Sequence, residues 1–500
     1  MNQYGDLNEE VVRKQNDLAA DVYKAEAKRL RILLVFSVVA CLIVGWLFGS
    51  FFPAPGTGNM TQYIPVTLNS DAKIEAVQGI MESDWFFGKD IEDLDTRLTD
   101  QALYGITANE EDPHTSYMSS EEIQEFTQSI NRNFVGIGVQ FIVSNGVNLI
   151  DAVFRNSPAE RAGIQPGDLI SAVDGVNVEG ETSDRIKELV LGDEGTPVVI
   201  TVQRGGEYLD IEIIRGAVNA TATGRMIGDV GYFEMYNFGD STADEMKGYL
   251  DDFVAQGATK LIIDLRDNGG GYLDSLQRVA SFFLPKNTVV MRQAYPDESE
   301  DLIFSTGNEY KQFDGIVILI NANTASASEV LTMALKEKRD DVYLIGTTSY
   351  GKGTVQVTRY FDDGSALKYT TSRWLSPDGV WVNNVGIEPD ETVLLHDIMY
   401  RSYTGMADEE SYDVDSVSRA VQDIQLALDF MDYDIDRTDG YYSESTKKAV
   451  QAYQTSQNLT ADGVLTPDVY RAILSSVSYT WTVDDEKDPQ LQRALEYLHE

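Results

Sequence analysis

Residues 260–273 read KLIIDLRDNGGGYL, a short apolar run that ends in a turn of three glycines. A short apolar run bounded by a turn is typical of a strand buried on both faces of a sheet. Comparable runs alternate with helical segments along the chain, and they are VGYFEMYNF (230–238), GIVILIN (315–321) and VYLIG (342–346). Strands that alternate with helices predict a largely parallel sheet covered by helices.

The composition limits the classes of protein that this chain could be. Its 500 residues include 39 basic and 81 acidic side chains, so the formal net charge is -42, and this charge disfavours nucleic acid as a partner. A single cysteine excludes a disulfide scaffold, and three histidines leave little material for a zinc site, so we expect no metal and no cofactor.

A membrane anchor is predicted near the N-terminus. Residues 32–52, ILLVFSVVACLIVGWLFGSFF, carry no charge, and a helix rising about 1.5 Å per residue over this length matches a hydrocarbon core of about 30 Å. A signal peptide, the main alternative, has a shorter apolar region and a small-residue cleavage site. Basic residues crowd the preceding edge (Lys24, Lys28, Arg29 and Arg31). The positive-inside rule therefore predicts a single-pass protein of the cell membrane with its N-terminus in the cytoplasm and the rest on the cell-wall side.

Changes in composition divide the chain into segments, and we expect a multidomain α/β (α+β) protein. The expected segments are a cytoplasmic arm (1–31), a transmembrane helix (32–52), a linker with helices (53–120), a β-rich domain (121–217), the α/β core (218–400), an acidic linker (401–415), a small helical domain (416–478) and an acidic tail (479–500). The helical pattern of residues 70–120 leaves a homodimer open.

Two strand ends carry candidate chemistry, because functional sites of open α/β sheets lie at the carboxyl ends of the strands. After the strand at 260–265, the glycines offer bare N–H groups that suit an oxyanion, although a tight turn without a role is the alternative. After the strand at 315–321, Ser326 falls where a helix begins. A serine there can act as a nucleophile, or it can simply cap the helix.

A lysine is the best candidate for the base. Lys352 stands between Gly351 and Gly353, 26 residues after Ser326, and Gln356 follows four residues later. A lysine base must be uncharged, so its pKa must be lowered by burial. The alternative, His114 in the DPHTSY turn, has no clearly paired aspartate, and a Ser-His-Asp triad is therefore disfavoured.

Four motifs together resemble the carboxy-terminal processing proteases, which are tail-specific serine endopeptidases with a Ser-Lys dyad. The motifs are TASASEV, DLRDNGGGYL, YGKGTVQ and DPHTSY. The resemblance implies that Ser326 is the nucleophile, Lys352 the general base and Gln356 its orienting partner. It also implies oxyanion donors at the N–H groups of Ala327 and of Gly270 or Gly271.

This sequence departs from the family pattern at two places. Thr324 occupies the first position of the serine motif, and one residue is inserted within KEKRDDVYL, so that the usual spacing of 25 becomes 26. We expect the insertion to lie in the loop between helix and strand. The insertion leaves the acidic residue that supports the dyad unassigned, with Glu337 the nearest candidate.

Two further segments resemble known binding domains. The β-rich segment, with SPAERAGIQPGDLISAVDG, resembles a PDZ domain, which implies that a free C-terminus of a protein or peptide binds as an added strand. Its carboxylate-binding loop would be Phe134, Val135, Gly136, Ile137, Gly138 and Val139. Residues 435–474 resemble a peptidoglycan-binding domain, with a helical spacer as the alternative.

The expected protein is thus a membrane-anchored, extracytoplasmic serine endopeptidase that recognises protein C-termini and forms an acyl-enzyme. A catalytically inactive scaffold of PDZ and wall-binding domains is the competing hypothesis. A cell-wall hydrolase is disfavoured, because neither paired carboxylates nor a metal motif stands at the strand ends.

Overall fold

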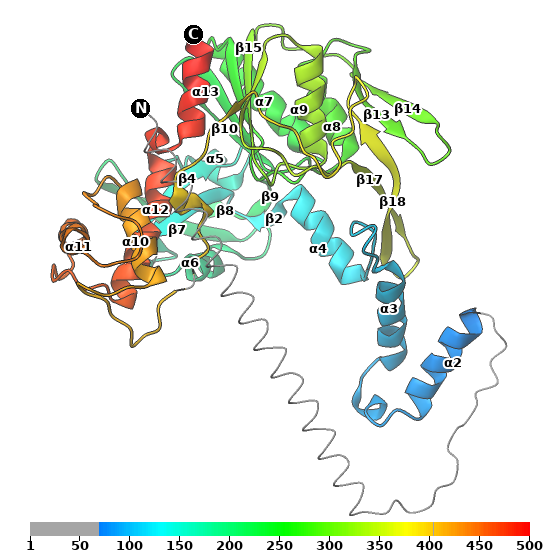
Figure 1. Ribbon diagram of the computed structural model, residues 1–500, viewed down its shortest axis with the longest axis horizontal. Coiled ribbons are helices and arrows are strands. Elements are labelled where there is room, and N and C mark those ends of the chain that lie inside the picture. Colours follow the sequence, from blue (N-terminus) through cyan, green and yellow to red (C-terminus); the bar gives the residue numbers. More distant parts are fainter. Residues whose placement is uncertain (1–69, 404) are drawn as a thin grey trace, which may run out of the picture. The chain divides into compact units, whose positions relative to one another are not determined.

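The computed structural model describes residues 70–403 and 405–500 (Figure 1). The predicted cytoplasmic arm (1–31) and transmembrane helix (32–52) lie outside these residues. Among the helices that are described, none combines the length and the apolar character that crossing a bilayer requires.

The chain divides after Asp95 into two compact units. The first contains helix α2 (Ser70–Ser83) and the short helix η1 (Gly88–Asp90). Helix α3 (Leu94–Thr107) begins at the boundary, and strand β1 (Ser116–Met118) and helix α4 (Ser120–Asn131) follow in the second unit. The helical pattern of residues 70–120 thus corresponds to α2 and α3.

A six-stranded sheet forms the centre of the second unit. Its strands, in spatial order, are β10 (Ala222–Ile227), β11 (Val230–Met235), β12 (Lys260–Asp264), β15 (Gly315–Ile320), β16 (Val342–Gly346) and β19 (Glu391–Thr392). Only β10 is antiparallel to its neighbour, which confirms the prediction of a largely parallel sheet.

Both faces of this sheet are buried, because side chains alternate between them along each strand. In β12, Leu261 and Ile263 face the larger core, and Ile262 faces the opposite side. Three helices cover the larger core, and they are α7 (Thr242–Ala255), α8 (Leu273–Ala280) and α9 (Ala327–Lys338).

The opposite face is covered by the end of the chain, where we had expected an acidic tail (479–500). That expectation is wrong: α12 (Pro467–Val483) runs into this segment, and η3 (Asp485–Lys487) and α13 (Pro489–His499) follow. Leu491, Ala494 and Leu498 share one side of α13 and pack on the sheet (Figure 1, red). The apolar spacing is hidden by the acidic residues between α12 and α13.

A second, antiparallel sheet lies beside the first and was not anticipated. It contains β1, β18 (Ala366–Leu375), β13 (Val289–Ala294), β14 (Glu300–Phe304) and β17 (Thr354–Tyr360). Strands β17 and β18 form the hairpin that follows Lys352, so this sheet carries the second half of the YGKGTVQ motif.

The β-rich domain is a five-stranded antiparallel sheet with a short added strand. Its strands are β3 (Val139–Ser144), β4 (Val147–Val153), β5 (Leu169–Val173), β6 (Val176–Asn177), β7 (Pro197–Arg204) and β8 (Glu207–Ile214), with helices α5 (Pro158–Ala162) and α6 (Ser183–Val190). Strands β2 (Asn133–Gly136) and β9 (Gly216–Asn219) pair and connect it to the core. Strand β3 forms one edge of the sheet.

The C-terminal domain is built from α10 (Arg419–Phe430), α11 (Glu444–Ser456) and α12, preceded by the short helix η2 (Asp397–Tyr400). Its core contains Val421, Val450 and Tyr453. Part of the predicted acidic linker packs on this domain, because Tyr412 and Leu465 exchange two backbone hydrogen bonds of 3.0 and 2.9 Å.

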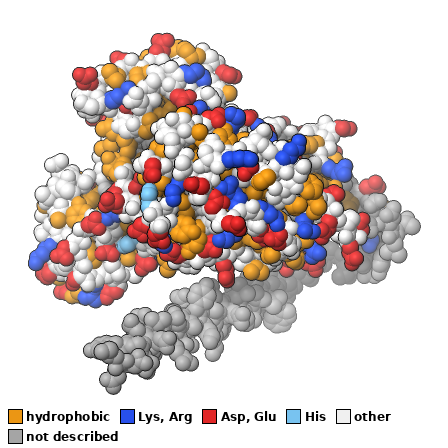
Figure 2. All heavy atoms as spheres, turned by 90° about the horizontal axis from the view of Figure 1, so that it is seen from above, with side chains coloured by type: hydrophobic (Ala, Val, Ile, Leu, Met, Phe, Trp, Pro, Cys, Tyr) orange, Lys and Arg blue, Asp and Glu red, His pale blue; other side chains and the backbone are white. Residues whose placement is uncertain are grey.

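Charged side chains are dispersed over the surface. On the face drawn in Figure 2, acidic side chains are spread widely, with Lys and Arg among them. The net charge of -42 is therefore not gathered into one patch on this face.

Candidate active site

The predicted nucleophile sits on a strained turn at the end of β15. Ser326 directly precedes α9 and has φ 57° and ψ -117°. A non-glycine residue with such a backbone costs free energy and persists only where the surroundings impose it. The turn is therefore held in place by other contacts, which the following paragraphs describe.

The glycine turn after β12 packs directly against the serine turn. A Cβ on Gly270, whose φ is 101°, would lie 2.9 Å from both the Ala327 nitrogen and the Ser326 Cβ. Only glycine permits this approach. The N–H of Gly270 donates to Asn268 Oδ1 at 2.9 Å. Gly270 is therefore a poor choice for an oxyanion donor, and Gly271 remains the better candidate beside Ala327.

A buried glutamate joins the serine turn to the lysine loop. Glu329 is 0% exposed, and its Oε2 accepts the N–H groups of Ser326 (2.8 Å) and Lys352 (2.9 Å). Its Oε1 accepts the Gly351 N–H (2.7 Å) and the Ser349 hydroxyl (2.6 Å). One carboxylate thereby fixes two segments whose motifs were recognised separately in the sequence.

The sequence had pointed to another glutamate for this supporting role. Glu337 lies two turns further along α9, where its carboxylate accepts the backbone N–H of Asp378 at 2.7 Å. It has no contact with the serine turn or the lysine loop. Glu329, an acid in the first turn of α9, could not be assigned this role from the sequence, because its four backbone and hydroxyl partners leave no trace in the sequence pattern.

Lys352 lies in an environment that favours its uncharged form. Burial lowers the pKa of Lys352, and the charge of Lys368 lowers it further, whereas Glu329 and Asp112 raise it. The Lys352 carbonyl accepts the Trp374 indole N–H at 2.7 Å, which holds the loop from its other side. Burial is thus the largest cause of the lowered pKa, as a lysine base requires.

Gln356 is linked to the DPHTSY turn. Its amide donates to Thr370 Oγ1 at 3.0 Å, and that hydroxyl donates to Asp112 Oδ1 at 3.0 Å. Burial lowers the pKa of His114, and the charge of Lys352 acts in the same direction. The turn therefore reaches the site through Asp112 and Thr370, and His114 is kept predominantly neutral near pH 7.

The predicted residues of the protease motifs meet at one cavity. A cavity of about 330 Å³ is lined by Ser326, Ala327, Gly270, Gly271, Lys352, Gln356 and Lys368. Its volume suits a few side chains of a peptide, and its walls also include Phe126 from α4 and Trp374 from β18.

The six residues of the predicted carboxylate-binding loop lie elsewhere. Phe134, Val135 and Gly136 belong to β2, Ile137 is buried, and Val139 begins β3. A Cβ on Gly138, whose φ is 85°, would lie 2.3 Å from Ser157 Cβ, so this position requires glycine. None of these six described residues lines the cavity.

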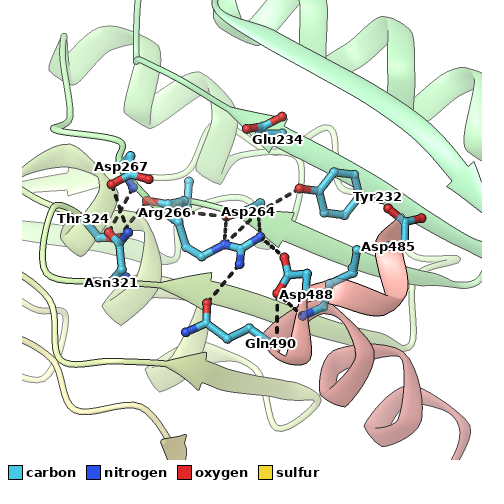
Figure 3. A network of polar contacts seen from close by, with 12 residues as sticks. Tyr232, Glu234, Asp264, Arg266, Asp267, Asn321, Thr324, Asp485, Asp488 and Gln490 are labelled. Atoms are coloured by element: carbon cyan, nitrogen blue, oxygen red, sulfur yellow. Dashed lines mark hydrogen bonds and ion pairs between the residues drawn. The ribbon is translucent and has the colours of Figure 1, made fainter. Parts of the chain in front are cut away.

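A polar network supports the base of the glycine turn (Figure 3). Arg266 follows β12 and contacts two carboxylates, Asp264 at 2.5 Å and Asp488 at 2.8 Å. Its other guanidinium nitrogen donates to Gln490 Oε1 at 3.0 Å. Asp488 also accepts the N–H groups of Gln490 and Leu491, each at 3.0 Å. The start of α13 is therefore tied to the strand that carries the glycine turn.

The substituted position of the serine motif retains a useful hydroxyl. Thr324 Oγ1 donates to the Leu265 carbonyl at 2.8 Å, a bond that serine could also make. Asp267 accepts the amides of Asn321 (3.0 Å) and Asn323 (2.7 Å), so the two turns are joined by side chains as well (Figure 3).

Three family models match parts of the chain. Residues 229–393 match "Peptidase family S41", residues 149–204 match "PDZ domain", and residues 418–473 match "Putative peptidoglycan binding domain". The matched ranges lie within the core (218–400), the β-rich domain (121–217) and the C-terminal domain (416–478).

Similar proteins include two named "Probable CtpA-like serine protease". The one from Staphylococcus haemolyticus (strain JCSC1435) is 34% identical over 371 residues, which cover 73% of this chain and 74% of that protein. The one from Staphylococcus aureus (strain N315) is 33% identical over 395 residues, 78% of each chain. Among solved structures, the photosystem II D1 C-terminal processing protease aligns with 64% of this chain and 91% of its own, at 23% identity and a TM-score of 0.36.

Proposed function

This chain belongs to peptidase family S41 and is a serine-type peptidase, and we propose that it cleaves proteins near their C-termini with a Ser326–Lys352 dyad. The observation that carries the proposal is the buried Glu329 carboxylate, which binds the backbone N–H groups of both residues beside the cavity that both line. A serine with a strained backbone and a lysine with a lowered pKa, both at one cavity, are typical of a functional site.

The proposed reaction begins with the uncharged Lys352 amine, which takes the proton of the Ser326 hydroxyl as its oxygen attacks the peptide carbonyl. The N–H groups of Ala327 and Gly271 stabilise the oxyanion. Lys352 then gives the proton to the departing amine, and an acyl-enzyme remains. Water, activated by the same lysine, hydrolyses the acyl-enzyme and restores the serine. Gln356 orients the lysine from β17.

The test is a comparison of two alanine variants in the same motif. Ser326→Ala is expected to lower peptide hydrolysis by about 10⁴-fold or more, because the nucleophile is lost. Ser328→Ala is the control, since the Ser328 hydroxyl is buried and donates to the Asn268 carbonyl at 3.0 Å. The control should retain hydrolysis within about tenfold. Hydrolysis that survives in Ser326→Ala would disprove the assignment of the nucleophile.

The inactive-scaffold hypothesis makes a different prediction. A fluorophosphonate probe reacts with an activated serine, so the parent chain should be labelled and Ser326→Ala should not. A scaffold without an activated serine would show equal, background labelling of both.

We propose that the protein is anchored in the cell membrane by residues 32–52, with its catalytic and wall-binding domains outside. The absence of charge in this segment and the match to a peptidoglycan-binding model support the proposal. Cys41 is the only cysteine, so the variants Gln3→Cys and Asn458→Cys can report the topology. A membrane-impermeant maleimide should label whole cells only through position 458, and isolated peptidoglycan should co-sediment the solubilised chain.

A homodimer through residues 70–95 is also part of the proposal. Three exposed apolar residues recur along α2, and they are Ile74, Val77 and Ile80, with exposed fractions of 40%, 60% and 37%. Residues spaced in this way lie on one side of a helix and suit a partner helix. Sedimentation velocity should give a dimer for the parent chain and a monomer for Val77→Asp.

A further inference from the structure

The edge of the PDZ domain at which a peptide would bind is partly occupied by the C-terminal domain. Strand β3 is the edge strand of its sheet and pairs with β4 on one side only. Ser144 and Val147 pair across the two-residue turn Asn145–Gly146. Because backbone groups alternate in direction along an antiparallel strand, the carbonyl of the preceding Val143 points away from β4, toward the free edge.

Helix α12 contacts this free edge. The Ser475 hydroxyl donates to the Val143 carbonyl at 3.3 Å, so one outward-facing backbone group of β3 already has a partner. Figure 1 shows α12 beside the strands of this domain.

The tip of the β3–β4 hairpin anchors the contact. The Asn145 amide lies 2.8 Å from Ser476 Oγ on α12 and 3.2 Å from the Tyr453 hydroxyl on α11. Ser476 and Tyr453 also bond each other at 2.9 Å. Asn145 has φ 49°, a left-handed backbone that asparagine tolerates and that aims the amide into the C-terminal domain.

The direction of a bound tail follows from the proposed function, on which this step rests. Its terminal carboxylate would bind at the loop that precedes β3, and the tail would add to the free edge as an antiparallel strand. Residues upstream in the tail would therefore run from Val139 toward Ser144, where they would meet α12.

We propose that α12 sets the length of substrate tail that pairs with β3. With α12 in place, only Val139 to Ile142 are open to an added strand, so about four residues of the tail pair there. A longer tail forms further backbone bonds only if the C-terminal domain moves off the hairpin. Asn145 and Ser475 are thus specificity-determining residues of the peptide-binding edge.

Two variants release α12 without altering the predicted carboxylate-binding loop. Asn145→Gly removes the amide and keeps a residue that accepts the left-handed turn, and Asn287→Gly is its control at another left-handed position, with φ 68°. Ser475→Glu places an acid opposite the Val143 carbonyl, and Ser478→Glu is its control at an exposed position of α12.

The measurement is fluorescence anisotropy with the detergent-solubilised full chain that also carries Ser326→Ala, so that the probes are not cleaved. The probes are a labelled tetrapeptide Ser-Ala-Ala-Val and a decapeptide ending in the same four residues, each with a free and an amidated C-terminus. In the parent chain and the controls, the two free-carboxylate probes should bind equally. In Asn145→Gly and Ser475→Glu, the decapeptide should bind about tenfold tighter than the tetrapeptide.

Two results would overturn the proposal in distinguishable ways. If the decapeptide binds no tighter than the tetrapeptide in Asn145→Gly and Ser475→Glu, α12 does not limit the length of tail that pairs with β3. The same conclusion holds if the decapeptide binds tighter by an equal factor in the parent chain. If free and amidated probes bind alike or not at all in every version, recognition of C-termini by this domain fails, and the inference fails with it.

Discussion

Two buried charges lie near the carboxyl ends of neighbouring strands, and they are stabilised in opposite ways. Glu329, in the helix after β15, is surrounded by neutral donors from two short segments. Arg266, directly after β12, contacts two carboxylates, one of which (Asp488) directly precedes helix α13.

The difference has a consequence for what each charge can do. A carboxylate that binds backbone N–H groups fixes the path of the main chain, so Glu329 positions the residues of the proposed dyad. A guanidinium between carboxylates joins whole elements, because each partner would otherwise be a buried, unpaired charge. Glu329 should therefore matter mainly for activity, and Arg266 mainly for stability.

Glu329→Gln should give the largest effect. A glutamine amide offers one oxygen in place of two, so donors that now share Oε1 or Oε2 lose their acceptor and the lysine loop shifts. We expect kcat/KM to fall by about 10²-fold or more, since small displacements of reacting groups cost this much. Glu337→Gln, on the same helix, should stay within about twofold. If Glu329→Gln and Glu337→Gln gave equal kcat/KM values, Glu329 would not position the proposed dyad, and its role would not differ from that of Arg266.

Asp488→Asn tests the other side of the comparison. It leaves Arg266 paired with Asp264 alone, and the loss of one charge-assisted contact costs about 2 kcal/mol. The thermal midpoint should fall, whereas kcat/KM measured well below it should change little. Asp485→Asn is the control, because its partner Arg225 is 48% exposed, and we expect a loss below about 1 kcal/mol. If Asp488→Asn instead abolished activity at full stability, Arg266 would belong to the catalytic machinery.

Glu234 lies near Asp264, the first partner of Arg266, and it makes the stability of this region depend on pH. Burial, together with the nearby Asp264, raises the pKa of Glu234 from 4.5 to about 7. Between pH 4.5 and 7 the folded protein therefore keeps the Glu234 proton, whereas the unfolded chain has lost it. The free energy of unfolding falls as pH rises through this range. Glu234→Gln should be more stable than the parent by about 3 kcal/mol at pH 8 and equal to it at pH 4.5, as measured by urea unfolding. A constant difference at both pH values would contradict the raised pKa.

Lys368→Met should have the smallest effect. The charge of Lys368 adds to burial in lowering the pKa of Lys352, and its ammonium group is held 4.6 Å from the centre of the Phe126 ring. Without that charge, Asp112 and Glu329 raise the pKa of Lys352, and less of the amine is uncharged. The acidic limb of the kcat/KM profile should move to higher pH, and activity at pH 7 should fall roughly threefold to tenfold. Lys368→Arg keeps the charge and should keep the profile.

Much of the central fold follows from the sequence. Strands such as 260–264 and 315–320 are continuous apolar runs, and each alternates its side chains between two cores, so the parallel sheet is specified locally. The covering of the second face by α13 could not be predicted, because α13 packs on strands that lie much earlier in the sequence. The contact between Arg266 and Gln490 spans 224 positions, a separation at which no local pattern helps.

The candidate site likewise contains residues whose role could be predicted from the sequence and residues whose role could not. Ser326 and Lys352 could be predicted because each lies in a short motif at a strand end, and the structure places both at one cavity. Glu329 could not be assigned its role, since it acts on backbone N–H groups that every residue carries. The choice between Gly270 and Gly271 likewise depends on a bond from Gly270 to the Asn268 side chain, which appears only in three dimensions.

The position of α13 bears on how the central sheet is completed. The helix contributes Leu491, Ala494 and Leu498 to the second core of the sheet, and Asp488, directly before the helix, contacts Arg266. Both the serine motif and the lysine motif precede this helix in the sequence. The sheet that carries them is therefore covered on its second face by a segment that is synthesised after both motifs.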